Sequence, residues 1–315
     1  MNVPPDVSII VVSWNTESLV DECLASIEQQ MPEDAFYETI VVDNASSDGT
    51  VELVKAKYPK ATLIANDENL GFATACNQAA RRAVGRYFLL LNSDASLRDG
   101  NVRKLVDMMD KDESIGVISG ALMGSSGRVS VPCKSFPRPV ELILGYSINL
   151  IYRKPKKSNN NRNARSIKRD VNGTKIYEAD WVPGCFVLVR GSLMDDNNLL
   201  EDDIFMYYED ALLCCKAWGK GLRVLAVEFT VADHVSGASS RQVSVTATRY
   251  SYESSLVYVK AMFGDKTLKW YQRVNRGIWR VMFSALTALN YLGITERADE
   301  KRKIFRSLLA VPQRS

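Results

Sequence analysis

Amide and carboxylate side chains follow three apolar runs of the chain, at the point where each run ends. The run at 87–91 stops at Asn92-Ser93-Asp94, and two earlier runs stop close to Asn15 and at Asp43. A carboxylate at the carboxyl end of a buried strand lies where open α/β sheets bind ligands. Mg²⁺-type ions prefer one or two carboxylates together with phosphate oxygens, so Asp94 is a candidate metal ligand. A simple Asn/Ser/Asp turn accounts for most such tripeptides, so the metal-ligand interpretation depends on residues elsewhere in the chain.

The elements that must position these side chains alternate along the first part of the chain. Apolar runs predict strands at 7–12, 39–42, 61–65 and 87–91, and helical spacing of apolar residues predicts helices between them. Strands alternating with helices indicate an α/β fold with a parallel sheet and right-handed crossovers. Because parallel strands share one carboxyl edge, Asn15, Asp43 and Asp94 are expected to converge on one crevice.

Further polar side chains near these strand ends suit a nucleotide. Asp43 with Asn44 could accept hydrogen bonds from the ring N–H groups of a base or from ribose hydroxyls. The segment that begins Asn69-Leu70-Gly71 predicts a helix start at Asn69, with Asn77 two turns further on. A helix N-cap and a ligand contact are equally good interpretations of Asn69.

Two more candidates lie far along the chain. Glu209 and Asp210 follow the aromatic cluster Phe205-Met206-Tyr207-Tyr208, which would partly desolvate a carboxylate and raise its pKa toward that of a general base. Two acids at a helix N-terminus also complement the helix dipole, which is the plainer interpretation. His234 is the single histidine of the chain; such a residue is more often structural, although a neutral imidazole can ligate a metal.

The order of these motifs is more specific than any one of them. Along the chain stand Ser13-Trp14-Asn15, the Val-Asp-Asn-Ala-Ser-Ser-Asp-Gly-Thr segment at 42–50, Asn69-x-Gly-Phe-Ala, Leu-Leu-Asn-Ser-Asp at 90–94, Trp181-x-x-Gly184, Tyr-x-Glu-Asp at 207–210 and His234-x-x-Gly237. This set resembles glycosyltransferase family 2, which has a GT-A fold, and within it the bacterial rhamnosyltransferase-type members. The resemblance covers about Val7 to Lys260.

The resemblance implies an inverting transfer of a sugar from a nucleoside diphosphate to an acceptor hydroxyl, helped by Mg²⁺ or Mn²⁺. It makes Asp210 the catalytic base, assisted by Glu209, and Asp94 and His234 the metal contacts, although Asn92 stands where the family's Asp-x-Asp motif has its first Asp. Trp181, Gly184 and Tyr208 would shape the acceptor side. The residues expected to bind the nucleotide sugar are Ser13, Asn15, Asp43, Asn44, Asn69, Gly71, Asn77, Asn92 and Ser93.

The donor and the acceptor are less closely defined. The subgroup resemblance favours dTDP-L-rhamnose, with a UDP-hexose or UDP-N-acetylhexosamine as the alternative, because Asp43 suits uracil and thymine alike. The acceptor is expected to be a glycan or a lipid-linked saccharide of a bacterial surface polysaccharide. A nucleotidyltransferase would be expected to carry a Gly-rich basic loop after its first strand, and an NAD-dependent enzyme a GxGxxG motif; Ser13-Trp14-Asn15-Thr16-Glu17 is neither. A non-catalytic nucleotide-binding protein is the remaining alternative.

Charge divides the chain into two parts. The net charge is +3, but residues 260–315 hold 12 Lys and Arg against 4 Asp and Glu. The predicted organisation is a GT-A domain at 1–260, with a nucleotide-sugar half at about 1–125 and an acceptor half at about 126–260, followed by a basic amphipathic helical tail at 261–315. In that tail Arg273, Arg276 and Arg280 fall on a polar stripe, while Trp270 and Val281 occupy the other side.

The partners expected of this tail are an anionic membrane surface, the body of the protein or a second subunit. Nucleic acid is not expected, since the basic segments lack interleaved aromatic residues. Six cysteines without CxxC spacing favour a reducing cytosol. Neither a signal peptide nor a spanning helix is expected, which together predict a cytoplasmic protein attached peripherally to the inner face of the bacterial membrane.

Overall fold

A computed structural model describes residues 5–31, 37–151, 164–169, 173–234, 244–291 and 298–314. These residues divide into two compact units. An α/β unit comprises residues 1–136, 159–205 and 209–239, and a helical unit comprises residues 137–158, 206–208 and 240–315.

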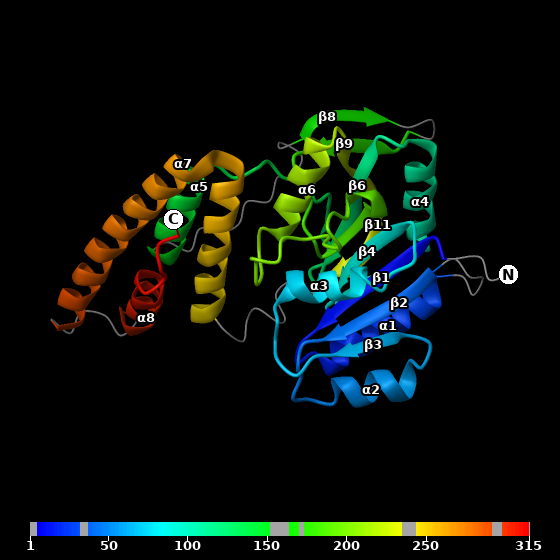
Figure 1. Ribbon diagram of the computed structural model, residues 1–315, viewed down its shortest axis with the longest axis horizontal. Helices are drawn as coiled ribbons and strands as arrows, with labels where there is room; N and C mark the ends of the chain where they lie inside the picture. The colour runs from blue at the N-terminus through cyan, green and yellow to red at the C-terminus, as the bar shows by residue number, and fades with distance from the viewer. Residues whose placement is uncertain are drawn as a thin grey trace. The chain divides into compact units, whose positions relative to one another are not determined.

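The α/β unit is built on one mixed sheet flanked by helices (Figure 1). Its main path has the strand order β3-β2-β1-β4-β10-β6-β11-β9-β8. The strands are β1 (Val7–Ser13), β2 (Tyr37–Asp43), β3 (Thr62–Ala65), β4 (Tyr87–Asn92), β5 (Ala95–Leu97), β6 (Ile115–Gly124), β7 (Val129–Ser130), β8 (Ala164–Arg169), β9 (Lys175–Ala179), β10 (Phe186–Arg190) and β11 (Arg223–His234). The flanking helices are α1 (Glu17–Gln30), α2 (Thr50–Lys57), α3 (Phe72–Ala80), α4 (Asn101–Lys111) and α6 (Glu209–Gly219), and a short 3₁₀ turn η2 (Gly191–Leu193) follows β10.

The four strands predicted from apolar runs are present and parallel. β1 pairs in parallel with both β2 and β4, and β2 pairs with β3. Ser13 is level with Asp43, and Val12 is level with Asn92, so the polar strand ends lie at one edge. β10 runs antiparallel to β4 and β6, which makes the sheet mixed rather than purely parallel.

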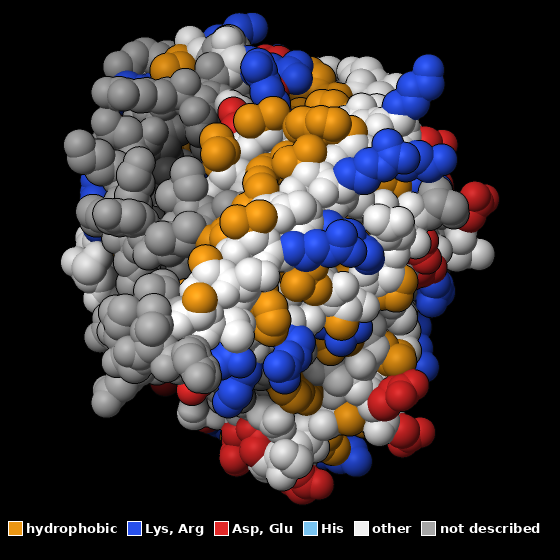
Figure 2. Space-filling model, turned by 90° about the vertical axis from the view of Figure 1, so that its left-hand side faces the viewer, with side chains coloured by type: hydrophobic (Ala, Val, Ile, Leu, Met, Phe, Trp, Pro, Cys, Tyr) orange, Lys and Arg blue, Asp and Glu red, His pale blue; other side chains and the backbone are white. Residues whose placement is uncertain are grey.

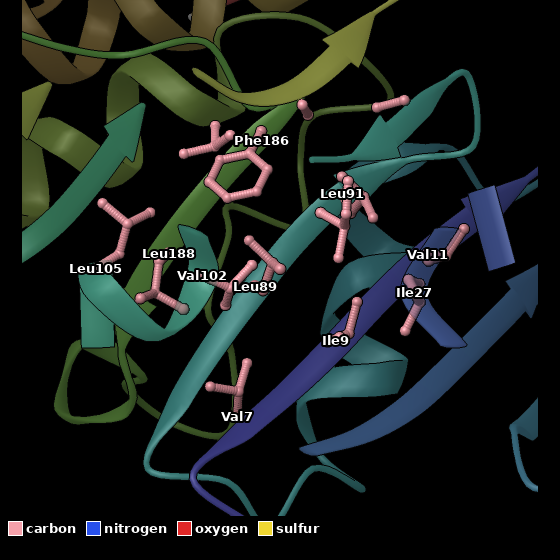
Figure 3. Close-up of a cluster of buried hydrophobic side chains, with 14 of the residues drawn as sticks. Val7, Ile9, Val11, Ile27, Leu89, Leu91, Val102, Leu105, Phe186 and Leu188 are labelled. Carbon is pink, nitrogen blue, oxygen red and sulfur yellow. The ribbon is translucent and has the colours of Figure 1, made fainter. Parts of the chain in front are cut away.

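The core explains why these runs form strands. Every residue from Tyr87 to Leu91 is at most 5% exposed, as expected of a strand buried on both faces. On one face, alternate residues of β1, β4 and β10 meet side chains of α1 and α4 (Figure 3). The residues labelled there are Val7, Ile9, Val11, Ile27, Leu89, Leu91, Val102, Leu105, Phe186 and Leu188.

Two local predictions from the sequence were wrong. The helical pattern that begins at Phe72 predicts a helix to about Val84, but α3 ends at Ala80. Ala79 O there accepts hydrogen bonds from both Arg82 N and Ala83 N, in a tighter turn that leads into β4. The segment 153–169 holds eight Lys and Arg residues and no acid, which predicts an exposed loop. Residues 164–169 instead form β8, which pairs antiparallel with β9; residues 153–163 lie outside the described part of the chain.

The helical unit contains α5 (Pro139–Ile151), α7 (Ser244–Tyr291) and α8 (Ala298–Leu309). α7 is two helical segments joined at Gly264, whose φ of 78° is not helical. The basic tail therefore belongs to a unit that begins before residue 261 and includes α5. Within the described residues, no helix combines the length and the apolar character needed to cross a bilayer.

Candidate active site

The carboxyl edge of the parallel strands is held together by hydrogen bonds between the loops that follow them. After β1, the Oδ1 atom of Asn15 accepts a hydrogen bond from Ser47 N at 2.7 Å, and Asn15 N donates to Ser46 Oγ at 2.8 Å. Asn15 adopts a left-handed φ of 51°. Ser13 Oγ lies 3.0 Å from Thr16 Oγ1, which in turn donates to Ser93 Oγ at 3.2 Å. These contacts join the loops after β1, β2 and β4.

Asp43 lies at the centre of this edge and is 1% exposed. Its Oδ2 accepts from Ser46 N at 2.8 Å and its Oδ1 from Ser46 Oγ at 2.6 Å. Each carboxylate oxygen has two acceptor sites, so these bonds orient Asp43 and leave acceptor capacity for a ligand. Ser46 therefore fixes the orientation of Asp43, a role that the sequence interpretation missed. The available signal was the Asp-Asn-Ala-Ser segment itself, because Asp and Ser side chains often bond to nearby backbone in turns.

Asn44, Asn69 and Gly71 form one structural cluster. Asn44 Nδ2 donates to Gly71 O at 3.1 Å, and Asn69 Oδ1 accepts from Gly71 N at 3.0 Å. Phe72 N donates to Phe205 O at 2.7 Å at the start of α3. The described contacts of Asn44 and Asn69 thus hold the turn into α3, and Gly71, rather than Asn69, is the residue at the N-cap position.

Gly71 is required by both its conformation and its surroundings. Its φ is 85°, and a Cβ atom there would lie 2.5 Å from the backbone oxygen of Phe205. We expect Gly71→Ala to lower the free energy of unfolding by about 1–3 kcal/mol, since left-handed strain adds to a clash with backbone. Gly219→Ala is the matched control, because a Cβ at Gly219 would meet nothing within 4 Å. Urea unfolding of both variants measures the difference; equal stabilities would contradict the expectation.

Asn77 is fully buried on α3 and its side-chain amide is engaged with protein groups. Its Oδ1 accepts from Leu199 N and Leu200 N, each at 2.9 Å, and its Nδ2 donates to Leu200 O and to Asp202 Oδ1. The structure therefore places Asn77 under the 198–202 loop. Asn77 therefore positions this loop, and its polar atoms are already engaged with protein groups.

Asp94 and His234 come together although 140 positions separate them in the sequence. Asp94 Oδ1 lies 3.2 Å from His234 Nε2, and their side chains are 7% and 18% exposed. β11 brings them together, since it ends at His234 and pairs there with Ala95 of β5. The sequence interpretation did not predict β11, although the apolar run Val224-Leu225-Ala226-Val227 indicates a strand.

The donor set of this pair fits a divalent metal ion. A carboxylate oxygen and an imidazole nitrogen suit Mn²⁺, and Mg²⁺ or Mn²⁺ completes its shell with water and substrate phosphate oxygens. Among the described residues, no group of three or more His, Cys, Asp and Glu side chains forms a closed cage. An ion held by Asp94 and His234 would need further ligands, which water and the oxygens of a diphosphate can supply.

Two backbone N–H groups fix the orientation of the Asp210 carboxylate. Its Oδ2 accepts from Gly184 N at 3.0 Å and its Oδ1 from Ala211 N at 2.8 Å. A Cβ at Gly184 would lie 3.4 Å from the Asp210 Cβ, which is an ordinary van der Waals distance. Gly184 is predicted as an acceptor contact; in the structure its N–H orients Asp210. Trp181, three residues earlier, donates from Nε1 to Ser135 O at 2.9 Å.

Glu209 is the buried member of the acidic pair. It is 8% exposed, and its Oε2 atom finds no hydrogen-bond partner among the described residues. Burial, reinforced by the charge of Asp210, raises the pKa of Glu209 to about 8. Burial raises the pKa of Asp210 to about 6, against the opposing effect of the N–H groups of Gly184 and Ala211. The pair therefore carries about one negative charge near neutral pH.

These pKa values predict how the rate of glycosyl transfer would depend on pH with Asp210 as the general base. A general base acts only when ionised, so kcat/KM should rise with pH up to about 6 and then level off, with a slope of one on the acid side. Glu209→Gln mimics the protonated glutamic acid and should leave that acid limb in place. A wild-type limb near the ordinary aspartate pKa of about 4 would contradict the assignment of a buried base.

Cys185 connects the two halves of the site. Burial raises the pKa of its thiol, and the charges of Asp210 and Asp94 raise it further, so this side chain lies near both carboxylates. Asn92 N donates to Cys185 O at 3.0 Å, which ties the end of β4 to the segment before β10. The candidate base and the candidate metal ligand thus both lie near one buried residue.

Tyr208 belongs to the helical unit, while Glu209 and Asp210 belong to the α/β unit. Tyr207 and Tyr208 adopt left-handed φ angles of 75° and 67°. Within the helical unit, Ser254 Oγ donates to Met206 O at 2.8 Å and the rings of Tyr208 and Tyr258 lie 5.3 Å apart. Strained residues persist only where contacts hold them, and these contacts hold the segment directly before the acidic pair.

Comparison with known proteins identifies the family. The family model described as Glycosyl transferase family 2 matches residues 8–177, more than half of the chain. The chain belongs to glycosyl transferase family 2. The resemblance inferred from the ordered motifs is thereby confirmed at the level of the family.

One sequence relative and two solved structures illustrate what the chain is similar to. A poly(ribitol-phosphate) beta-glucosyltransferase of Bacillus spizizenii is 32% identical over 135 residues, which are 41% of this chain and 21% of that protein. The solved structure of Staphylococcus aureus TarS 1-349 has a TM-score of 0.54 at 16% identity and covers 96% of this chain and 89% of that one. A Pyrobaculum calidifontis mannosyltransferase solved with GDP-Man and Mn²⁺ has a TM-score of 0.53 at 18% identity, covering 98% and 86%.

These likenesses confirm the GT-A fold with its parallel-rich mixed sheet and C-terminal helices. The matched segments span 51%, 30% and 21% of the length of the first curated relatives. The family and the fold are therefore shared, while the activity and partners of the whole relatives are not carried over with them.

Proposed function

We propose that this protein transfers a sugar from a nucleoside diphosphate donor to a hydroxyl group of a glycan or lipid-linked acceptor, with inversion at the anomeric carbon. The observation that carries the proposal is that two groups meet near the segment Gly184-Cys185. Gly184 N and Ala211 N fix Asp210, and Cys185 O accepts from Asn92 N, two residues before Asp94, which pairs with His234. Inversion by single displacement needs a base on the acceptor side and positive charge on the leaving-group side.

The roles of the residues follow from these positions. Asp210 takes the proton of the acceptor hydroxyl while that oxygen attacks the anomeric carbon, and the bond between that carbon and the diphosphate oxygen breaks. Gly184 and Ala211 hold the Asp210 carboxylate in one orientation through this step. Glu209, predominantly protonated near neutral pH, would help to bind the acceptor. A divalent ion, when bound, supplies charge that stabilises the departing diphosphate, and Asp94 and His234 would hold it.

The donor half of the site would be formed by the strand ends of β1, β2 and β4. Asp43 is oriented by Ser46 and would accept a hydrogen bond from the base. Asn15 follows the neighbouring strand β1, and Asn92 ends β4 on the other side of β1, at the same edge of the sheet. Ser93 would complete the ribose and diphosphate contacts. The roles of Asn44, Asn69 and Asn77 would be indirect, because their described contacts position the surrounding loops.

Two donor classes are proposed. dTDP-L-rhamnose is favoured by the resemblance to rhamnosyltransferase-type members. A UDP-linked hexose or N-acetylhexosamine is favoured by the relatives, since one is a poly(ribitol-phosphate) beta-glucosyltransferase and the TarS structure was also solved with UDP-GlcNAc. These relatives also support a role in bacterial surface polysaccharide synthesis. A lipid-linked acceptor would place the enzyme peripherally at the inner face of the membrane.

The proposal is tested by measuring the release of nucleoside diphosphate from dTDP-rhamnose, UDP-glucose, UDP-galactose and UDP-N-acetylglucosamine. Each donor is assayed with Mn²⁺, with Mg²⁺ and with EDTA. Metal-dependent release from one donor would support the reaction and identify the sugar. Binding of dTDP or UDP by calorimetry without any turnover, with candidate acceptors supplied, would instead indicate a nucleotide-binding protein.

A further inference from the structure

The second segment of α7, residues 265–291, packs through one face only. Tyr271, Asn275 and Trp279 on that face are fully buried. The Trp279 ring makes an edge contact with Tyr252 of the first segment at 4.5 Å between centroids. Since residues three and four apart share a face of a helix, these contacts establish which face of the segment points into the unit and which points outward.

The outward face carries an apolar ridge. Trp270 is 44% exposed and Val281 is 70% exposed, and Val274, Ile278 and Ala285 lie between or beside them at steps of three and four residues. Of these five, Ala285 is also exposed, and Val274 and Ile278 are half-buried. Exposed tryptophan and valine on a helix that already buries its other face are not needed to form the core of the unit.

A basic edge runs beside the apolar ridge. Lys266, Lys269, Arg273 and Arg280 are exposed, and they follow one another at helical spacing. The sequence from Lys266 to Tyr291 contains five Lys and Arg residues and no Asp or Glu. Figure 2 shows hydrophobic side chains in a band, with Lys and Arg side chains beside it.

We propose that the apolar ridge and the basic edge of α7 dock on a phospholipid membrane that carries anionic headgroups. A helix that presents Trp and aliphatic side chains along one line and cations along the next lies in the interface plane of a bilayer. The cations would meet lipid phosphates while Trp270 and Val281 enter the boundary between headgroups and acyl chains. This inference rests on the proposed function in one respect: membrane binding would bring the enzyme to a lipid-linked acceptor.

Charge argues against a second copy of this chain as the occupant. A two-fold dimer through the outward face would bring two basic edges together, because the same surface serves both subunits. With no acidic side chain between Lys266 and Tyr291, the segment offers no opposite charge to pair with them. An anionic surface pairs with every one of these cations, so the membrane is the better match.

The test is co-sedimentation of the full chain with vesicles of phosphatidylcholine alone and with about 30 mol% phosphatidylglycerol. Binding is expected only with the anionic vesicles at about 50 mM salt, and it should weaken strongly at about 500 mM. The double variant Arg273→Glu/Arg280→Glu should lower the vesicle partition coefficient about thirtyfold or more, given the usual contribution of each cation at a membrane surface. Trp270→Ser/Val281→Ser should lower it while leaving the net charge unchanged.

The matched control is Lys55→Glu/Lys60→Glu, which changes the net charge equally at two exposed positions of the α/β unit. It should bind vesicles as the wild type does. Failure of the wild type to sediment with anionic vesicles, equal loss in the control, or a dimer that dissociates in the double variant would each overturn the proposal. Nucleoside diphosphate release with a soluble acceptor, measured on the same samples, reports separately on the proposed reaction.

Discussion

Asp210→Asn should lower the rate of glycosyl transfer by a factor on the order of 10²–10⁴, the usual contribution of a positioned general base. The asparagine side chain keeps the shape of the aspartate, and its oxygen can still accept from Gly184 N or Ala211 N. It cannot take a proton from the acceptor hydroxyl. Affinity for the nucleoside diphosphate should be retained, because the candidate nucleotide contacts lie at the strand ends of β1, β2 and β4.

Steady-state assays of transfer and calorimetric titration with the nucleoside diphosphate measure the two effects on one sample. Asp196→Asn makes the same chemical change at an exposed loop position and should leave both quantities unchanged. If Asp210→Asn lost nucleotide affinity with its activity, Asp210 would belong to the metal and diphosphate side of the site. If it kept full activity, another group would be the base.

The nucleotide-binding strands could be predicted from the sequence because their signals are local. The run Tyr87–Leu91 is apolar throughout and is buried throughout, and the polar residues that stop β1, β2 and β4 lie at one edge as parallel pairing requires. A strand that is buried on both faces is indicated by a few consecutive apolar residues. The pattern therefore predicts both the strand and the position of Asp94 at its end.

The contacts that complete the site join residues far apart in the sequence. His234 reaches Asp94 only because β11 pairs with β5 and β6 through two register shifts near Thr230, and no local pattern encodes that pairing. Likewise, the hydrogen bond from Gly184 to Asp210 depends on where the segment before β10 passes α6. The motif order suggested that these residues act together, but the interaction of each with its partner follows from the folded chain.

The tail shows how a correct pattern can leave burial undecided. Helical spacing predicts one polar and one apolar stripe after Trp270, and both stripes are present. Spacing does not say which face of the helix is covered by the rest of the unit. Trp279 is fully buried whereas Trp270 is 44% exposed, because the buried face centres on Tyr271, Asn275 and Trp279.

Asp94→Ala should reduce metal-dependent turnover by a factor on the order of 10²–10³, since a metal ion contributes several kcal/mol to stabilising charge on a leaving group. The Asp94 side chain is 7% exposed and its Oδ1 faces His234 Nε2 at 3.2 Å, so the substitution removes the carboxylate of the pair and keeps only its imidazole. A single neutral nitrogen cannot offset the charge of the ion as a carboxylate does. The requirement for Mn²⁺ should shift to higher concentrations.

The readouts separate the metal from the base. Mn²⁺ titration of the nucleoside diphosphate affinity should show a strong dependence in the wild type and a weak one in Asp94→Ala, whereas Asp210→Asn should keep the wild-type dependence. Asp99→Asn, at an exposed position five residues later, is the matched control, and thermal unfolding confirms that each variant is folded. An Asp94→Ala protein with unchanged Mn²⁺ dependence would place the ion elsewhere. Base and metal would then no longer lie together near Cys185, and the single-displacement geometry proposed for this site would have to be abandoned.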